Sequence, residues 1–274
     1  MFDSIAGDYD SLNHILSLDV DKIWRKKALK QIVDAPAPVQ VLDLACGTGD
    51  FSIAIAKALS RSHKRVVTPI EVHVKASVKA PVEAPAKAPV EAQVTSTGFV
   101  TGDSGRSDLM TKGHVTGVDL SEGMLAVMRE KVAKAGLTEM ISIEEGDGEN
   151  LRFPDNTFDR VTIAFGIRNF EDRPKGLREM LRVLKPGGRL VILELSRPEN
   201  KIIRWFYDLY FLHILPKVGG KVSGDKAAYA YLPASVAAFP GKKAFMATMR
   251  EAGFRTVTHK AFTLGICRMY TGEK

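Results

Sequence analysis

Short apolar runs with strand propensity alternate with segments of helical periodicity along most of this chain. The predicted strands cover residues 39–45, 114–120, 141–147, 158–165, 189–196, 254–262 and 264–271. The predicted helices cover residues 50–60, 121–136, 173–184, 201–215 and a segment near 242–252. Ser121 is predicted to cap the second helix and Gly136 to end it, and a Lys-Pro-Gly-Gly turn is predicted at 185–188. Because parallel strands need crossover helices, the alternation predicts an α/β fold with a doubly wound, mainly parallel sheet of seven strands.

Residues 61–113 differ in composition from the rest of the chain. They are rich in Ala, Pro, Val, Lys and Glu, with Pro81, Pro85 and Pro89 four residues apart. Prolines at this spacing break a helix and favour extended chain, and the segment has few residues that could form a core. We therefore predict one domain over residues 1–274, interrupted by a disordered surface insertion at about 61–113.

The overall composition excludes several classes of protein. The chain has 39 Lys and Arg against 32 Asp and Glu, a formal net charge of +7, and 45% hydrophobic residues, which is ordinary for a folded domain. Its 2 cysteines are too few for a disulfide scaffold or a four-cysteine zinc site. The polar N-terminal segment does not resemble a secretory signal, and no long uncharged apolar stretch predicts a membrane span. A cytoplasmic protein is expected.

A glycine-containing turn follows the first predicted strand. The segment 41–50 reads VLDLACGTGD, with Gly47, Thr48 and Gly49 in the turn and Asp43 on the strand beneath it. Such a turn lets the backbone approach a ligand closely, although it can also serve only to pack the strand against the next helix. The dinucleotide fingerprint is not complete, because Ser52 stands at its third glycine position. A carboxylate below the turn fits a cationic or amine-bearing ligand better than a pyrophosphate.

Acidic residues end the next two predicted strands. Asp119 could accept both hydroxyls of a ribose, and Asp147 in the segment Gly146-Asp147-Gly148 could accept an adenine amino group. The alternatives are a helix N-terminal acid for Asp119 and a turn residue for Asp147. All these residues, with Ala164 at the end of the fourth strand, fall at carboxyl ends of successive strands, where open α/β sheets bind ligands.

These motifs resemble those of class I methyltransferases that use S-adenosylmethionine (SAM). LDLACGTGD is similar to their first motif, GVDLSEGML to their second and EGDGENLRFPDNTFD to their third. The distance between the first two motifs is longer than usual in that class, and the predicted insertion accounts for the difference. The resemblance implies a Rossmann-like fold.

Three further segments are similar to signatures of the ubiquinone/menaquinone biosynthesis C-methyltransferase family. They are MFDSIAGDYDSLNHILSLDVDKIW at the N-terminus, FGIRN at 165–169 and RVLKPGGRLVILELS at 182–196. Leu12 and Asp21 depart from the usual Met and His, and Ala164 replaces a frequent serine. The resemblance implies SAM as methyl donor, a polyprenylated quinol as acceptor, and SAM contacts at Thr48, Asp119, Asp147 and Gly148.

Carbon methylation of a quinol requires electron density on a ring carbon. A phenolic hydroxyl has a pKa of about 10, so it needs a base or a stabilising donor at neutral pH, and no metal is required. Arg168, Asn169 and Tyr9 are the predicted catalytic residues: Arg168 stabilises the phenolate or relays its proton, and Asn169 orients the ring oxygen. A solvated loop arginine or a structural salt bridge is the alternative for Arg168, and a packed aromatic for Tyr9. His213 could act as a direct base, but a histidine in an apolar helix is more often a packed residue.

The segment 202–216 is strongly apolar and aromatic but contains Arg204 and Asp208. We interpret it as a cap over the acceptor site that receives the isoprenoid tail and contacts the inner face of the membrane. A core helix is the alternative.

Several questions stay open at the level of the sequence. The acceptor is expected to be demethylmenaquinol, with a polyprenyl methoxy-benzoquinol or another small hydrophobic molecule as alternatives. A SAM-binding module without catalytic activity is a further option. No nucleic-acid partner is expected, because the chain lacks an Asn-Pro-Pro-Tyr-type motif and a basic aromatic face. The oligomeric state is open, a homodimer being one option.

Overall fold

The computed structural model describes residues 20–34, 39–66, 113–210 and 226–274. Their strands form one seven-stranded sheet in the order β3-β2-β1-β4-β5-β7-β6. The strands are β1 Gln40–Leu44, β2 His114–Asp119, β3 Ile141–Glu145, β4 Phe158–Ala164, β5 Leu184–Leu195, β6 Arg255–Phe262 and β7 Cys267–Glu273. β1 to β5 pair in parallel, whereas β7 is antiparallel to both β5 and β6. The predicted fold class is confirmed.

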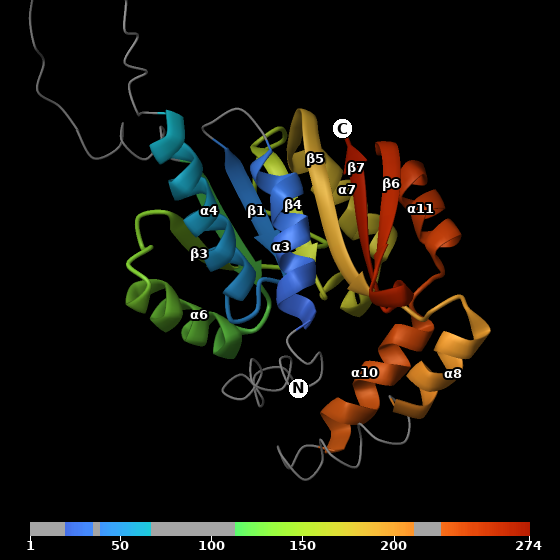
Figure 1. Ribbon diagram of the computed structural model, residues 1–274. Helices are drawn as coiled ribbons and strands as arrows, with labels where there is room; N and C mark the ends of the chain where they lie inside the picture. The colour runs from blue at the N-terminus through green and yellow to red at the C-terminus, as the bar shows by residue number, and fades with distance from the viewer. Residues whose placement is uncertain (1–19, 35–38, 67–112, 211–225) are drawn as a thin grey trace, which may run out of the picture.

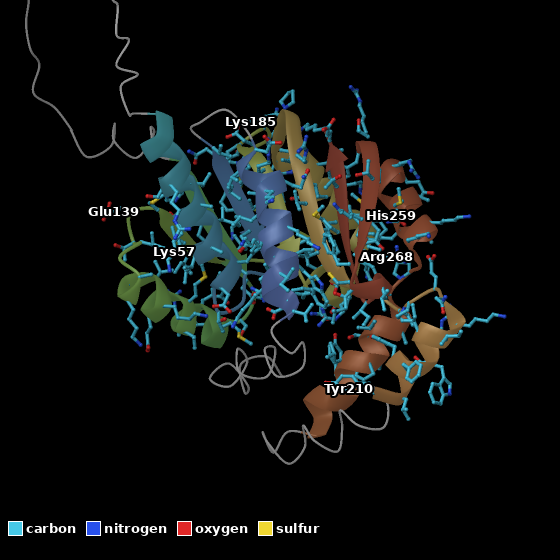
Figure 2. All side chains as sticks on the ribbon, viewed as in Figure 1. Lys57, Glu139, Lys185, Tyr210, His259 and Arg268 are labelled. Carbon is cyan, nitrogen blue, oxygen red and sulfur yellow. The ribbon has the colours of Figure 1, made fainter. Side chains whose placement is uncertain are left out.

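Helices cover both faces of the sheet (Figure 1). The α-helices are α3 Val20–Val33, α4 Asp50–Val66, α6 Glu122–Lys134, α7 Arg173–Val183, α8 Lys201–Leu209, α10 Lys226–Ala238 and α11 Lys242–Glu251. Two short 3-10 helices, η1 Ile167–Asn169 and η3 Thr263–Gly265, complete the described elements. Charged side chains such as Lys57 and Glu139 lie on the outside of these layers (Figure 2).

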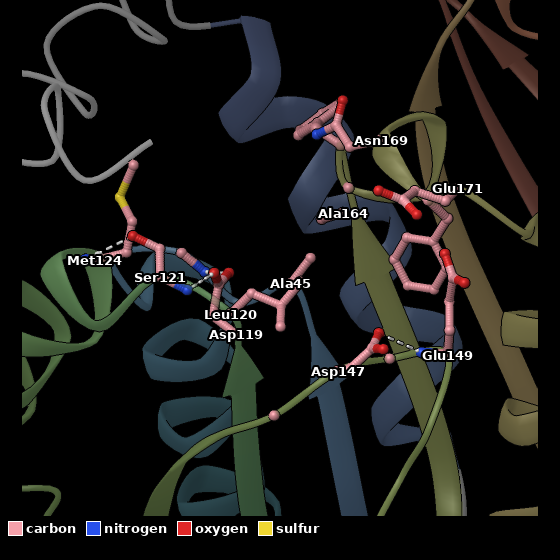
Figure 3. Close-up of a pocket in the computed structure, with 16 residues that line it drawn as sticks. Ala45, Asp119, Leu120, Ser121, Met124, Asp147, Glu149, Ala164, Asn169 and Glu171 are labelled. Carbon is pink, nitrogen blue, oxygen red and sulfur yellow. Dashed lines mark hydrogen bonds between the residues drawn. The ribbon is translucent and has the colours of Figure 1, made fainter. Parts of the chain in front are cut away.

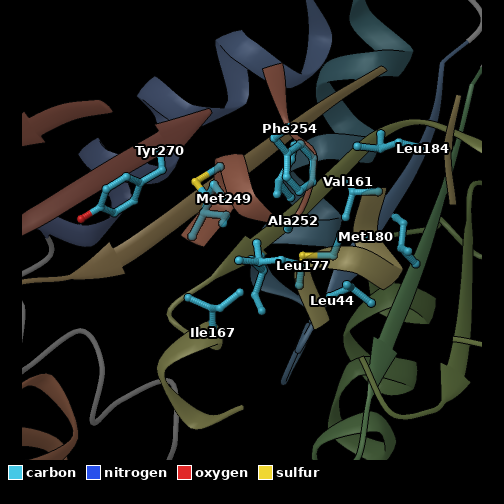
Figure 4. Close-up of a cluster of buried hydrophobic side chains, with 14 of the residues drawn as sticks. Leu44, Val161, Ile167, Leu177, Met180, Leu184, Met249, Ala252, Phe254 and Tyr270 are labelled. Carbon is cyan, nitrogen blue, oxygen red and sulfur yellow. The ribbon is translucent and has the colours of Figure 1, made fainter. Parts of the chain in front are cut away.

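Alternate residues of β1 contribute to different cores. Val41 packs with the side chains of α3, α4 and α6, whereas Leu42 packs with those of α7 and α11. Both are fully buried, and burying such a side chain contributes about 1.5–3 kcal/mol. Figure 4 shows part of the second core, where Leu177 and Met180 of α7 approach Met249 of α11. Cores on both faces explain why consecutive residues of the central strands are buried, four in a row in β1, β2 and β4.

The strand order reverses beside β1. β2 and β3 follow on one side of β1, while β4 and β5 follow on the other. At such a reversal the loops after neighbouring strands diverge, which leaves a crevice at the carboxyl ends of the strands. The site described below lies at this point of the sheet.

Local structure differs from the sequence prediction in several places, and α3 was not predicted at all. The predicted turn at 185–188 is wrong, because β5 begins at Leu184 and runs through these residues. They form an irregularity in the pairing with β4, and Gly187 adopts a left-handed conformation with φ of 75°. α4 extends to Val66, beyond its predicted end at residue 60, and α10 lies between the predicted helices 201–215 and 242–252, where no helix was predicted.

Two predictions concern residues outside the ranges that the structure describes. Residues 67–112, most of the predicted insertion, lie outside the described ranges, so the division of the chain into one domain with an insertion stays a prediction. The predicted helix 201–215 corresponds to α8 up to Leu209, and residues 211–215 lie outside the description.

Candidate active site

A cavity of about 460 Å³ opens at the carboxyl ends of β1, β2 and β4 (Figure 3). Its lining consists of small residues, backbone, a few apolar side chains and a set of acids. Every charged residue that lines it, within the described ranges, is acidic: Asp119, Asp147, Glu149 and Glu171. Such a lining repels phosphate groups and suits hydroxyl or amino donors and positive charge. The cavity therefore fits a cationic nucleoside better than an anionic one.

The turn after β1 is held in an unusual backbone conformation. Ala45, Gly47 and Gly49 have φ of 48°, 56° and 83°, in the left-handed region. At Gly49 a Cβ atom would stand 2.4 Å from Cγ of Met128, so only glycine fits between the turn and α6. The Gly47 N–H donates to Oδ2 of Asp119 over 2.8 Å. The turn and the end of β2 are thereby tied together.

Asp119 lies both at the N-terminal end of α6 and in the cavity wall. The sequence had left a helix N-terminal acid and a ribose acceptor as alternatives for this residue. Its Oδ1 accepts the N–H of Ser121 over 3.0 Å, and Oγ of Ser121 caps α6 by accepting the N–H of Met124. Asp119 therefore belongs to the helix N-terminus, and the predicted Ser121 cap is confirmed. The residue also lines the cavity. Its carboxylate is fixed by two backbone N–H groups at a place where ligand hydroxyls could reach it.

The loop after β3 brings Asp147 and Gly148 to the same cavity. Oδ1 of Asp147 accepts the N–H of Glu149 over 2.8 Å, a local turn contact of the kind kept as the alternative for this residue. At Gly148 a Cβ atom would stand 2.6 Å from the Phe170 ring, which also lines the cavity. A larger residue at 148 would displace the ring and change the shape of the cavity.

Asp43 is almost fully buried beneath the turn. Its carboxylate accepts a hydrogen bond from Oγ of Ser52 over 2.6 Å. Desolvation raises the pKa of Asp43 to about 7, and the charge of nearby Asp119 adds to this effect. Asp43 lines a small neighbouring pocket together with Arg25 and Thr48. A cation placed there would favour the ionised carboxylate.

The remaining predicted cofactor residues lie beside the cavity. Thr48 is buried, lines the small pocket and accepts a hydrogen bond from Nζ of Lys131 over 3.3 Å. Gly49 packs against α6. Gly47, Asp119, Asp147 and Gly148 line the main cavity, and Gly47 also lines the small pocket with Asp43. The structure brings these residues together, whereas their contacts with SAM stay a prediction.

Arg168 is buried and extensively bonded. Its guanidinium forms an ion pair with Glu194, with 3.0 Å between Nη1 and Oε1. Nη1 also donates to the Phe165 carbonyl, and Nε donates to Oγ of Ser235 over 3.2 Å. Arg168 is not among the described residues that line the cavity. This geometry favours the structural alternative, and the direct catalytic role expected of Arg168 stays a prediction.

Asn169 lies at the Ala164 end of the cavity (Figure 3). Its backbone N–H donates to the carbonyl of Gly166, the residue before η1, and its Oδ1 accepts a hydrogen bond from the Tyr231 hydroxyl over 2.8 Å. The predicted catalytic residue Tyr9 lies outside the described residues, as does His213.

Several residues of the site were not predicted from the sequence. Glu149, Glu171 and Phe170 line the cavity but belong to loops, where no periodicity marks them. Glu194 did leave a signal, because a lone carboxylate within an apolar strand needs a buried partner. Tyr231 left none, since its contact with η1 depends on how α10 packs.

Solved structures of SAM-dependent methyltransferases share this fold. One is a SAM-dependent methyltransferase from Aquifex aeolicus, with 18% identity, a TM-score of 0.53, and coverage of 90% of this chain and 88% of the other. Another is a putative SAM-dependent methyltransferase from Methanococcus maripaludis, with 16% identity, a TM-score of 0.57, and coverage of 100% and 94%. The fold is that of the SAM-dependent methyltransferases.

The sequence profile of the ubiE/COQ5 methyltransferase family matches residues 1–274, and the chain belongs to this family. It is 42% identical to the ubiquinone/menaquinone biosynthesis C-methyltransferase UbiE of Geobacter sulfurreducens, covering 100% of this chain and 87% of the relative. It is 40% identical to the demethylmenaquinone methyltransferase of Deinococcus radiodurans, covering 100% and 91%. The family resemblance expected from the N-terminal and FGIRN segments is confirmed.

Two features of the described residues bear on the membrane and on metals. No described helix is long and apolar enough to cross a bilayer. No three His, Cys, Asp or Glu side chains of the described ranges meet in a group that could hold a metal ion. The expectation that the reaction needs no metal stays a prediction.

Proposed function

We propose that this protein transfers a methyl group from SAM to a ring carbon of a polyprenylated quinol, converting demethylmenaquinol to menaquinol. The observation that carries the proposal is the exclusively acidic charge of the cavity wall, which suits a sulfonium nucleoside, in a chain of the ubiE/COQ5 family. The name of the relative from Deinococcus radiodurans supports demethylmenaquinol as the acceptor.

The carboxylates along the turn and the strand ends would hold SAM. Asp119, fixed by the N–H groups of Gly47 and Ser121, would accept the ribose hydroxyls, and Asp147 with Gly148 would contact the adenine. Asp43 and Thr48, in the small pocket, lie where they could face the positively charged part of the molecule. Bound SAM supplies an electrophilic methyl group.

The chain must then stabilise the phenolate oxygen of the acceptor. Among the described residues that line the cavity, Asn169 offers an uncharged amide donor, and its Nδ2 would donate to the ring oxygen. Arg168 would act mainly through η1, since Glu194, Phe165 and Ser235 already engage its guanidinium. Tyr9 is kept as a third candidate on the basis of the N-terminal signature.

The exposed face of α8 supports contact with a membrane surface. Ile202, Trp205, Phe206 and Leu209 are spaced for one helical face, and Trp205 is 61% exposed. The rings of Trp205 and Phe206 pack edge to face, 4.9 Å apart. An aromatic helix face carrying Lys201 and Arg204 is typical of helices that lie in the lipid interface, which is where a polyprenylated quinol resides. The core-helix alternative does not fit this exposure.

The proposal is tested with methyl-labelled SAM and a panel of reduced quinones. Label should enter demethylmenaquinol, and the product should carry it on a ring carbon by mass spectrometry. Transfer only to a methoxy-benzoquinol, or only to tail-free phenols, would replace the proposed acceptor with one of the two alternatives. Heat of SAM binding without transfer to any acceptor would indicate a binding module.

Membrane contact is tested separately by flotation with vesicles of zwitterionic and anionic lipids. The protein should float with the vesicles, and Trp205→Ser/Phe206→Ser should reduce the floating fraction while SAM binding is unchanged. Equal flotation of the variant would show that α8 is not the contact. Size-exclusion chromatography with light scattering would test whether the protein is a homodimer.

A further inference from the structure

Two hydroxyl groups of α10 contact the segment that carries Asn169. The Tyr231 hydroxyl donates to Oδ1 of Asn169 over 2.8 Å, and Oγ of Ser235 accepts from Nε of Arg168 over 3.2 Å. α8 and α10 lie at the end of the sheet where β5 ends (Figure 1). Tyr231 is 62 residues from Asn169 in sequence and does not belong to the described lining of the cavity. Among the described residues, its hydrogen bond to Asn169 connects it to the lining of the cavity.

The contact with Tyr231 gives the two ends of the Asn169 amide different roles. An asparagine side chain carries an acceptor oxygen and a donor NH₂ group, and a freely rotating amide presents either end to a ligand. Because the phenol occupies Oδ1, Nδ2 is left as the end available to the cavity. The hydrogen bond to Oδ1 also polarises the amide, which strengthens Nδ2 as a donor.

The charge of the cavity makes this orientation important. All charged lining residues of the described ranges are acids, and a phenolate that forms beside them is repelled. An amide oxygen turned toward the acceptor would add to the repulsion, whereas the NH₂ group opposes it. Arg168, the neighbouring cation, does not replace the Asn169 amide as a donor to the phenolate, because it is buried and paired with Glu194.

We infer that Tyr231 is a positioning residue of the acceptor site: its hydroxyl fixes the Asn169 amide so that Nδ2 faces the ring oxygen of the quinol. The inference rests on the proposed function and adds a specific residue on α10 to it. Tyr231 selects for an acceptor that bears a hydroxyl or phenolate next to the reacting carbon.

The decisive variant is Tyr231→Phe, which removes one hydroxyl and keeps the ring. We expect kcat for quinol methylation to fall about ten-fold, the size of one hydrogen bond in the transition state, with KM and calorimetric affinity for SAM unchanged. Ser235→Ala removes the other α10 hydroxyl that contacts η1, and it should lower kcat less than three-fold. Equal losses in the two variants would overturn the inference, since Tyr231 would then only hold α10 in place.

A double-mutant cycle isolates the amide. In an Asn169→Ala background, Tyr231→Phe should change kcat less than two-fold, because the group it orients is gone. A further ten-fold loss in that background would overturn the inference.

A binding measurement separates this inference from the proposed function. We expect 2-methyl-1-naphthol to bind the protein loaded with S-adenosylhomocysteine about ten-fold more weakly in Tyr231→Phe. If no quinol is methylated but this difference is found, the proposed function fails and the positioning role stands. If methylation occurs and Tyr231→Phe matches the unmodified protein, the positioning role fails alone. Absence of naphthol binding and of turnover in the unmodified protein would overturn both.

Discussion

Two carboxylates are buried at opposite ends of the candidate site, and their surroundings differ. Glu194 on β5 is fully buried, and it accepts hydrogen bonds from the Arg168 guanidinium and from the backbone N–H groups of Arg168 and Leu195. Asp43 on β1 is 1% exposed, yet within the described ranges it forms no ion pair and accepts its side-chain hydrogen bond from Ser52. Burial accordingly raises the pKa of Asp43 to about 7.

The difference indicates what each end of the site does. A buried charge is tolerated when it is paired and hydrogen-bonded, so Glu194 and Arg168 complete each other within the chain. Among the described residues, Asp43 has only the charge of Arg25 in the same small pocket, which does not offset the effect of burial on its pKa, and a cationic ligand would add to that charge. One carboxylate therefore serves the architecture of η1, and the other is suited to binding.

The largest expected effect concerns the paired end. Arg168→Ala leaves Glu194 buried without its cation and should reduce the free energy of unfolding by about 3–5 kcal/mol. Chemical denaturation measures the loss, and Arg168→Ala/Glu194→Gln should recover at least half of it because the amide carries no charge. If Arg168→Ala is stable to within about 1 kcal/mol and kcat at saturation falls about 100-fold, Arg168 acts directly on the acceptor instead.

Asp119 lines the cavity at the binding end of the site, and its substitution should mainly lower the affinity for SAM. Asp119→Ala removes the acceptor proposed for the ribose hydroxyls and also releases the Gly47 N–H. We expect SAM to bind about 100-fold more weakly, which corresponds to about 2.7 kcal/mol. Calorimetry measures the affinity, and circular dichroism checks the fold. A variant that binds SAM within three-fold of the unmodified protein would remove Asp119 from the proposed site.

The unpaired carboxylate should also influence the stability of the ligand-free protein. The folded pKa of Asp43, about 7, lies above its unfolded value of 3.8. Between these values the folded state binds the extra proton, so its stability contribution is full at low pH and is lost as pH rises toward 7. From pH 5 to 8, the free energy of unfolding should fall by about 2.6 kcal/mol more in the unmodified protein than in Asp43→Asn. Parallel pH profiles of the two proteins would contradict this account.

The smallest effect is a pH dependence of SAM binding. A cationic ligand favours the ionised carboxylate, so affinity should drop about ten-fold for each pH unit below 7 and level off above it. Calorimetry between pH 5.5 and 8 tests this expectation. Asp43→Asn should bind more weakly at pH 8 and lose most of the pH dependence. A flat profile in the unmodified protein would show that Asp43 does not face the positive charge of SAM.

The two ends also differ in how well the sequence predicted them. Gly47, Asp119 and Asp147 follow buried strands directly, and the order of strands and helices places such positions at one edge of a sheet. Their meeting at the cavity was therefore predictable from spacing. Arg168 and Asn169 were singled out as well, but their partners Glu194 and Tyr231 are 26 and 62 residues away, and no local pattern connects them.

The sequence by itself determined the parallel sheet, the glycine turn and the row of acids, because strand and helix periods and turn chemistry are local properties. Only the tertiary structure decided that Arg168 is paired with Glu194, that Asp43 is buried without an ion pair among the described residues, and that α10 brings Tyr231 to Asn169. The physical reason is that burial and side-chain partnership depend on the packing of distant segments, and these set the charge and the hydrogen-bonding direction of each group.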